Sequence, residues 1–288
     1  MGCGALVRSD LFRVRPFSFY GIKELFAFCV MLLAFDIGNS DITVGLWKNE
    51  EWKHIWRISS KPDLPELYFG VKIRDYFFES SIEVSQVKTI VLSSVVPAMT
   101  EKIKNVSRTL FEKEPVVLGP KVYESLPMNI LNPFEIGSDL VANAAAAYFK
   151  YKQTCIVVDF GTALTFTTVS HEGKILGVSI APGLKTAIRS LSQNTAKLFD
   201  VPLEMPASSL GKNTVTAIQS GILFGYEGLV KNVVTRIREE LNTECPVIAT
   251  GGLSSAITSL SNFFYSIEPN LTLDGLRIIG ELVNSSKK

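Results

Sequence analysis

Asp36-Ile37-Gly38-Asn39-Ser40 is one of two similar stretches that decide how this chain folds, and Asp159-Phe160-Gly161-Thr162-Ala163-Leu164-Thr165 is the other. Each stretch begins with an acid that directly follows an apolar run typical of a buried β-strand. The chain then turns at a glycine and continues as a strand rich in β-branched residues. A single turn of this kind is ordinary, because Asp and Gly are common turn residues. Two copies with matching flanks indicate an internal duplication.

The residue types in both turns suit a metal-bound polyphosphate. Glycine lets backbone N–H groups approach phosphate oxygens, the Asn, Ser and Thr side chains donate further hydrogen bonds, and the acid can hold a hydrated cation. We therefore expect the two turns to hold one nucleotide from opposite sides, in a cleft between the two halves of the chain.

Other phosphate-binding patterns are absent or weak in this sequence. The dinucleotide pattern G-x-G-x-x-G does not occur, and the segment 211–214 lacks the first glycine of a Walker A loop because Pro206 stands in its place. We interpret 211–214 as a capped helix start. The glycines of Thr250-Gly251-Gly252 follow a strand and would let a flat ring or a phosphate approach the backbone.

The apolar periodicity predicts the same series of elements twice, and therefore an α/β protein with a mixed β-sheet in each half, flanked by helices. We predict strands at 31–36, 41–47, 54–59, 88–96, 115–118, 155–160, 164–170, 174–181 and 247–250, and helices at 64–79, 98–111, 141–148, 184–192, 214–240 and 274–284. Residues 1–30 are predicted to be an extension outside the fold, 31–152 the first domain and 153–288 the second.

Composition excludes several classes of protein. The net charge is +1 without a polybasic tract, so no nucleic-acid partner is expected. Four scattered cysteines and two histidines argue against a zinc site or a disulfide framework and suit a reducing cytoplasm. The apolar run 25–35 ends in the strand that delivers Asp36, so cleavage of a signal peptide there would destroy the first turn. We expect a cytoplasmic protein that does not associate with a membrane.

Asp139 lies where an extended segment enters a helix, near the positive end of the helix dipole. One interpretation is structural: Ser138 and Asp139 cap the helix. The other is chemical: the Asp139 carboxylate is a general base that accepts the proton of an alcohol attacking a γ-phosphoryl group.

Together these motifs resemble those of the type III pantothenate kinases, a branch of the actin-like and sugar-kinase ATPase superfamily. Residues 36–40 resemble the family pattern D-x-G-N-T, residues 132–139 resemble N-P-x-E-x-G-x-D-R without its final arginine, and residues 159–165 resemble D-x-G-T-A-x-T. Segments 180–184, 195–198 and 250–252 also follow in the family order.

The resemblance implies duplicated ribonuclease-H-like domains, a homodimer, and transfer of the γ-phosphoryl group of ATP to pantothenate, the first step toward coenzyme A. It implies that Asp139 is the proton acceptor, that Asp36 lies near Mg²⁺, and that Asp159 helps to hold K⁺ or NH₄⁺. The ATP-binding residues would be Asp36, Gly38, Asn39, Ser40, Asp41, Thr43 and Thr162. The pantothenate-binding residues would be Gly137, Ser138, Asp139, Leu140 and Thr195.

Two positions depart from the family pattern. Ser40 replaces threonine and keeps the hydroxyl, whereas Leu140 replaces an arginine suited to binding the substrate carboxylate. Lys185 and Arg189, on the predicted helix after Pro182, are our candidates to supply the missing charge.

Two alternatives stay open, and Leu140 favours the first of them. The chain could be a non-catalytic regulatory or accessory protein of the same family, or a kinase of the same superfamily with another small-molecule acceptor. The presence of Asp36, Asp139 and Asp159 favours catalysis, since a protein that only binds has little need of three carboxylates facing a polyphosphate.

Overall fold

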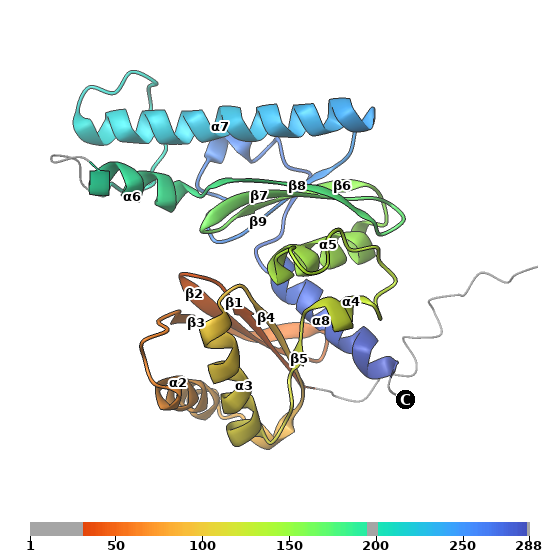
Figure 1. The fold of residues 1–288 in the computed structure, drawn as a ribbon. Helices are drawn as coiled ribbons and strands as arrows, with labels where there is room; N and C mark the ends of the chain where they lie inside the picture. The colour runs from red at the N-terminus through yellow and green to blue at the C-terminus, as the bar shows by residue number, and fades with distance from the viewer. Residues whose placement is uncertain (1–30, 195–200, 287–288) are drawn as a thin grey trace, which may run out of the picture.

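The computed structural model describes residues 31–194 and 201–286, and these form two similar five-stranded sheets (Figure 1). The first sheet has the order β3-β2-β1-β4-β5 and the second the order β8-β7-β6-β9-β10. The first contains β1 (Met31–Ile37), β2 (Asp41–Lys48), β3 (Glu51–Ser59), β4 (Val87–Ser94) and β5 (Val116–Val117). The second contains β6 (Cys155–Phe160), β7 (Ala163–Val169), β8 (Ile175–Pro182), β9 (Val247–Thr250) and β10 (Ser266–Ile267).

The pairing of the strands confirms the predicted mixed sheets. In each sheet the central strand, β1 or β6, pairs antiparallel with the strand that follows it and parallel with β4 or β9. The third strand, β3 or β8, extends each sheet antiparallel to the second strand. The two halves therefore place equivalent strands at equivalent positions, as the repeated sequence pattern predicts.

The helices form three layers, one outside each sheet and one between the two sheets (Figure 1). α2 (Glu66–Glu79) and α3 (Pro97–Phe111) cover the outer face of the first sheet, and α6 (Leu184–Asn194) and α7 (Thr214–Leu241) cover the outer face of the second. α5 (Ser138–Tyr151) and α8 (Leu271–Ser285) share one apolar core with the inner faces of both sheets. A short helix, α4 (Pro120–Tyr123), and two single 3₁₀ turns, Val84–Gln86 and Thr258–Leu260, complete the elements of the described residues.

α5 and α8 pack closely because small residues lie at their contact. A Cβ on Gly275 of α8 would lie 1.9 Å from the carbonyl oxygen of Ala142 in α5, and a Cβ on Gly280 would lie 2.4 Å from a methyl carbon of Val91 in β4. The indole N–H of Trp52 in β3 also donates a 2.8 Å hydrogen bond to Asp274 of α8. α8 is thus fixed to the inner face of the first sheet.

Several elements differ from the sequence prediction. β3 begins at Glu51, three residues before the predicted start at 54. Asn49 and Glu50, with φ of 54° and 61°, form a two-residue turn, so β2 and β3 pair right up to this turn. The short elements α4 and β10 are not predicted, since four and two residues are too few to show a period. Among the described residues, no helix has the length and apolar character that a membrane span requires.

Candidate functional site

Asp36 and Asp159 occupy equivalent positions in the two sheets. Each acid lies at the end of the central strand, between a hydroxyl residue on the antiparallel neighbour and another on the parallel neighbour. The neighbours of Asp36 are Thr43 and Ser93, and those of Asp159 are Thr165 and Thr250. The duplication therefore includes the polar side chains around each acid as well as the turn that follows it.

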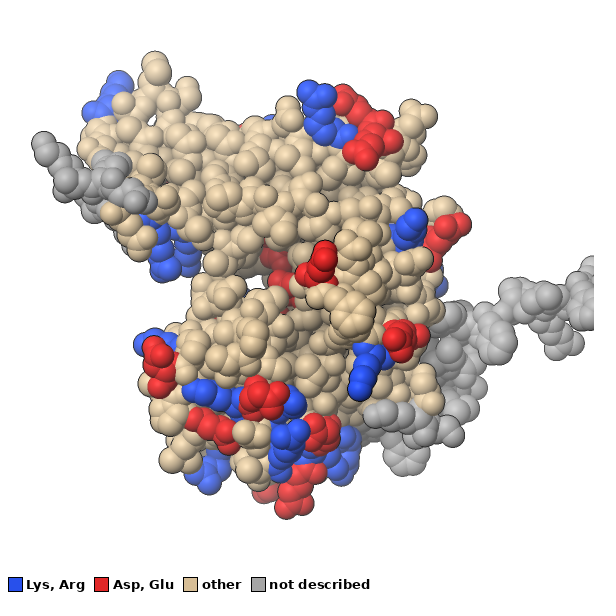
Figure 2. All heavy atoms as spheres, viewed as in Figure 1, with Lys and Arg blue, Asp and Glu red and all other residues tan. Residues whose placement is uncertain are grey.

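Strand alternation directs both acids toward the space between the halves. Leu32 and Ala34 of β1 and Cys155 and Val157 of β6 pack in the core between the sheets. Because side chains on a strand alternate between faces, the acid two residues after each pair points to the same inner face. Figure 2 shows acidic side chains in the hollow between the two halves.

The two loops that follow the acids meet across this space. The hydroxyl oxygens of Ser40 and Thr162 lie 3.0 Å apart, and both side chains are exposed. The first loop closes with a hydrogen bond from the Gly38 N–H to the Asp41 carbonyl (3.0 Å), and the second with one from the Gly161 N–H to the Ala163 carbonyl (3.1 Å). The predicted polyphosphate loops thus come together at one place.

Asp139 joins the two acids from the first turn of α5. Burial, and then the like charges of Asp139 and Asp159, raise the pKa of Asp36 to about 7. A hydrogen bond from Ser93 and the charge of Arg57 oppose this shift. Burial and then Asp139 raise the pKa of Asp159 to about 6, opposed by a hydrogen bond from Asn143. Burial also raises the pKa of Asp139, although the Leu140 N–H donates to its Oδ1 at 2.9 Å.

Ser138 fixes the start of α5 to β4 and does not cap the helix as one interpretation expected. Its side chain is buried, with its Oγ 2.9 Å from Ser93 Oγ and accepting a 3.0 Å hydrogen bond from the Ser94 N–H. Gly137 occupies the N-cap position without a side-chain cap. Leu140 is also buried, at 7% exposure. Of the first three residues of α5, only Asp139 is partly open to solvent.

Asn143 is a contact of Asp159 that the sequence analysis missed. Its side-chain N–H donates to Asp159 Oδ2 at 2.8 Å, and its carbonyl oxygen accepts a 2.9 Å hydrogen bond from Thr272 of α8. The signal was available, because Asn143 is the one amide among the alanines of a buried helix. Gly251 is also close, with a φ of 89°; a Cβ there would lie 2.4 Å from Asp159 Oδ1.

Two hydroxyls beside Asp159 have no hydrogen-bond partner in the part of the chain that the structure describes. Thr165 Oγ1 and Thr250 Oγ1 are buried and unpaired. Since buried polar groups normally find a partner, this oxygen-rich position suits a bound cation or water. Within the described residues, however, no three His, Cys, Asp or Glu side chains gather closely enough to hold one metal ion by themselves.

The remaining candidates lie on the second half. Lys185 and Arg189 are exposed on α6, and Figure 2 shows basic side chains below this region, at the mouth of the hollow. Thr195 lies outside the described residues.

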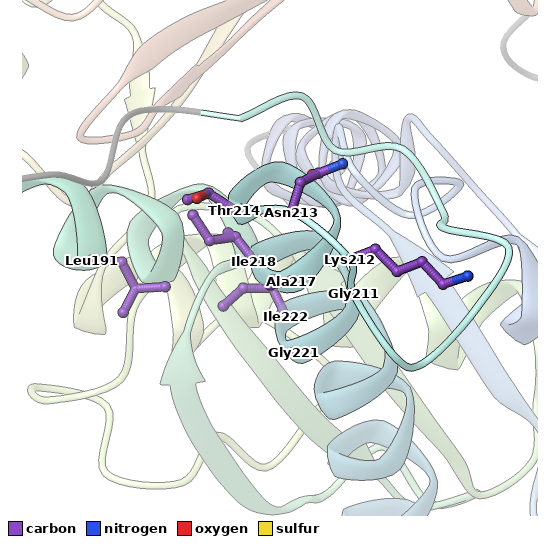
Figure 3. Close-up of a pocket in the computed structure, with 9 residues that line it drawn as sticks. All are labelled: Leu191, Gly211, Lys212, Asn213, Thr214, Ala217, Ile218, Gly221 and Ile222. Carbon is purple, nitrogen blue, oxygen red and sulfur yellow. The ribbon is translucent and has the colours of Figure 1, made fainter.

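Residues 211–214 form the capped start of α7 as expected: Asn213 accepts from the Thr216 N–H, and the Thr216 side chain in turn caps the Asn213 backbone. These residues line a cavity of about 710 Å³ between α6 and α7, and none of its described lining residues is a predicted site residue (Figure 3).

Comparisons with known proteins agree with the motifs. The family model described as type III pantothenate kinase matches residues 32–236. The chain is 39% identical to a type III pantothenate kinase of Geobacter sulfurreducens over 87% of this chain and 98% of the relative. It is 41% identical to one of Citrifermentans bemidjiense over 86% and 98%.

Solved structures are similar in fold. A Campylobacter jejuni protein described as a Baf family transcriptional activator superposes with a TM-score of 0.55 at 20% identity, covering 88% of this chain and 99% of its own. An ethanolamine utilization protein from Carboxydothermus hydrogenoformans superposes with a TM-score of 0.50 at 16% identity, covering 86% and 89%. The sequence matches, spanning nearly the full length of their relatives, determine the assignment: this chain belongs to the type III pantothenate kinase family.

Proposed function

We propose that this chain transfers the γ-phosphoryl group of ATP to the hydroxyl group of pantothenate. The observation that carries the proposal is the meeting of three carboxylates and two phosphate-type loops from both halves of the chain. Asp36 and Asp159 stand at equivalent strand ends, Asp139 lies close enough to raise the pKa of both, and Ser40 contacts Thr162. A site built in this way suits positioning and charge stabilisation, which are the main requirements of phosphoryl transfer.

In the proposed reaction the ATP phosphates lie between the two loops. Backbone N–H groups near Gly38 and Gly161 and the hydroxyls of Ser40 and Thr162 bind phosphate oxygens, with Asn39, Asp41 and Thr43 completing the nucleotide-binding loop. The Asp139 carboxylate accepts the proton of the pantothenate hydroxyl as its oxygen bonds to the γ-phosphorus and the bond to ADP breaks. A base whose pKa is raised by burial is better matched to this task at neutral pH.

The donor set around the acids fits the expected cations. Asp36 would help to hold Mg²⁺, and Asp159 with the unpaired hydroxyls of Thr165 and Thr250 would hold K⁺ or NH₄⁺. One carboxylate with neutral oxygens suits a singly charged ion, and phosphate oxygens and water would supply further ligands. When bound, these cations would offset the negative charge of the phosphates.

The acceptor would be bound near the start of α5, by Gly137, Ser138, Asp139, Leu140 and Thr195. Since Leu140 is buried and carries no charge, the pantothenate carboxylate needs another cation. Lys185 and Arg189 are exposed on α6 and can serve from the same subunit or, in the homodimer that we also propose, from its partner. Replacing either by Met should raise the KM for pantothenate about ten- to hundredfold and leave the KM for ATP nearly unchanged. An unchanged KM for pantothenate in both variants would contradict this assignment.

Leu140 also favours a second candidate, a regulatory member of the family that binds the nucleotide without phosphorylating pantothenate. An ADP-release assay with ATP, Mg²⁺, K⁺ and pantothenate, run beside Asp139→Asn, separates the two. Turnover that falls at least about a thousandfold in Asp139→Asn supports the kinase. Nucleotide binding without turnover supports the regulatory protein, and turnover with only another alcohol supports a kinase of different specificity.

A further inference from the structure

Strand β3 carries a cation, Arg57, into the site, and the proposed reaction gives this side chain no role. The strand pairing places Arg57 opposite Thr43, which in turn lies opposite Asp36. Directly opposed residues in a sheet share a face, so Arg57 lies on the same inner face as Asp36, two strands away. Its side chain is exposed, and the hydroxyl of Tyr76 donates a 3.0 Å hydrogen bond to its carbonyl oxygen, which ties the edge strand to α2.

The Arg57 guanidinium reaches the other half of the molecule. A Cβ placed on Gly252, just after β9, would lie 3.8 and 3.9 Å from its two terminal nitrogens. Its charge is also felt at Asp36, where it opposes the effect of the neighbouring carboxylates. None of the salt bridges within residues 31–194 and 201–286 uses Arg57. An exposed cation thus lies between the halves, and no carboxylate of the described residues forms an ion pair with it.

The order of the strands indicates which substrate Arg57 faces. Asp139 is fixed next to β4, because Ser138 bonds to Ser93 and Ser94, and β4 lies on one side of β1. β2 and β3 lie on the other side of β1, so Asp139 and Arg57 flank Asp36 from opposite sides. Phosphoryl transfer requires the attacking and leaving oxygens to lie on opposite sides of the transferred phosphorus. If the alcohol approaches from the side of Asp139, the leaving ADP lies on the side of Arg57.

We propose that Arg57 binds the diphosphate part of the nucleotide and stabilises the charge that develops on ADP as it leaves. As the alcohol oxygen bonds to the γ-phosphorus, the bond to the bridging oxygen breaks and its electron pair stays on the β-phosphate of ADP. The planar guanidinium, with several N–H donors, suits two phosphate oxygens at once. This inference rests on the proposed function, because it requires ATP to bind between the halves.

The test compares Arg57→Met and Arg57→Lys with the parent and with Arg74→Met, which removes an exposed arginine from α2 on the far face of the same sheet. ADP affinity is measured by calorimetry, and the KM for pantothenate and kcat by ADP release. We expect Arg57→Met to weaken ADP binding about ten- to hundredfold and to lower kcat, with little change in the KM for pantothenate. Arg57→Lys should recover part of the loss, and Arg74→Met should match the parent.

Each other outcome overturns the inference in a distinct way. Unchanged ADP affinity in Arg57→Met would show that the guanidinium does not contact the nucleotide. A rise confined to the KM for pantothenate would assign Arg57 to the acceptor, and equal losses for both substrates would indicate a structural role. A parent protein that binds neither ADP nor ATP would overturn the proposed function itself, and this inference with it.

Discussion

At the residue scale, the site keeps three carboxylates close together at a cost in stability. The pKa of Asp36 is raised to about 7, chiefly by burial and then by Asp139 and Asp159. A carboxylate whose pKa is higher in the folded state than in the unfolded chain stabilises the fold only while it is protonated, and this contribution is lost as the pH rises from about 4 to about 7. We predict that Asp36→Asn is more stable than the parent at pH 8, by about 1–3 kcal/mol, although it loses its activity.

Urea unfolding of the ligand-free protein at pH 8 and pH 4.5 checks this prediction. The difference between the two proteins should be much smaller at pH 4.5, where Asp36 of the folded parent is protonated as well. A variant that is less stable than the parent at pH 8 would show that hydrogen bonds to the charged carboxylate outweigh its burial.

Asn143 gives a second prediction at the same scale. Its amide bonds to both Asp159 and Thr272, so Asn143→Ala leaves two partly buried polar groups without a partner. We expect the free energy of unfolding to fall by about 2–4 kcal/mol, measured in urea at pH 7.5. Thr272→Val, which removes only the outer of the two bonds, should cost about 1 kcal/mol. Equal stability of Asn143→Ala and the parent would contradict this account of the contact.

At the scale of elements, glycine has opposite effects in two helices. A Cβ on Gly275 of α8 would overlap the Ala142 carbonyl, whereas a Cβ on Gly228 of α7 would have no described atom within 4 Å. Helix propensity alone predicts that alanine stabilises both positions by up to about 1 kcal/mol. We predict this gain only for Gly228→Ala, and a loss of about 2 kcal/mol or more for Gly275→Ala, because α5 and α8 would have to separate. Thermal unfolding of the two variants provides the measurement, and a gain at both positions would contradict the close packing.

The elements also show where sequence reasoning succeeded and where it could not. The acids at 36 and 159 and the turns after them could be predicted, because a strand that ends in Asp-x-Gly is a local pattern. The helix that contains Gly275 was predicted as well, at 274–284, but its position was not, since an apolar stripe does not reveal which sheet will cover it. The contact of Asn143 with Asp159 and the approach of Arg57 to Gly252 depend on how the two sheets face each other, and no local pattern encodes that arrangement.

At the scale of the whole molecule, the nucleotide should act as a link between the halves, since both loops contribute to its proposed site. A free ADP concentration of one hundred times its Kd should stabilise the protein by about 2.7 kcal/mol. We predict the same stabilisation in Asp139→Asn, which keeps both loops, and a smaller one in Thr162→Ala at the same ADP concentration. Urea unfolding with and without ADP tests this, and full stabilisation of Thr162→Ala would argue that the second loop does not contact the phosphates.

The location of α8 also has a consequence for biosynthesis. The inner face of the first sheet is covered by a helix that follows all the strands of both sheets in the sequence, so the early half of the polypeptide emerges from the ribosome with that apolar surface uncovered. The two sheets therefore cannot mature one after the other as independent units. Completion of the first must wait until translation reaches Leu271–Ser285, and a nascent chain stalled before that point should be a preferred client of chaperones.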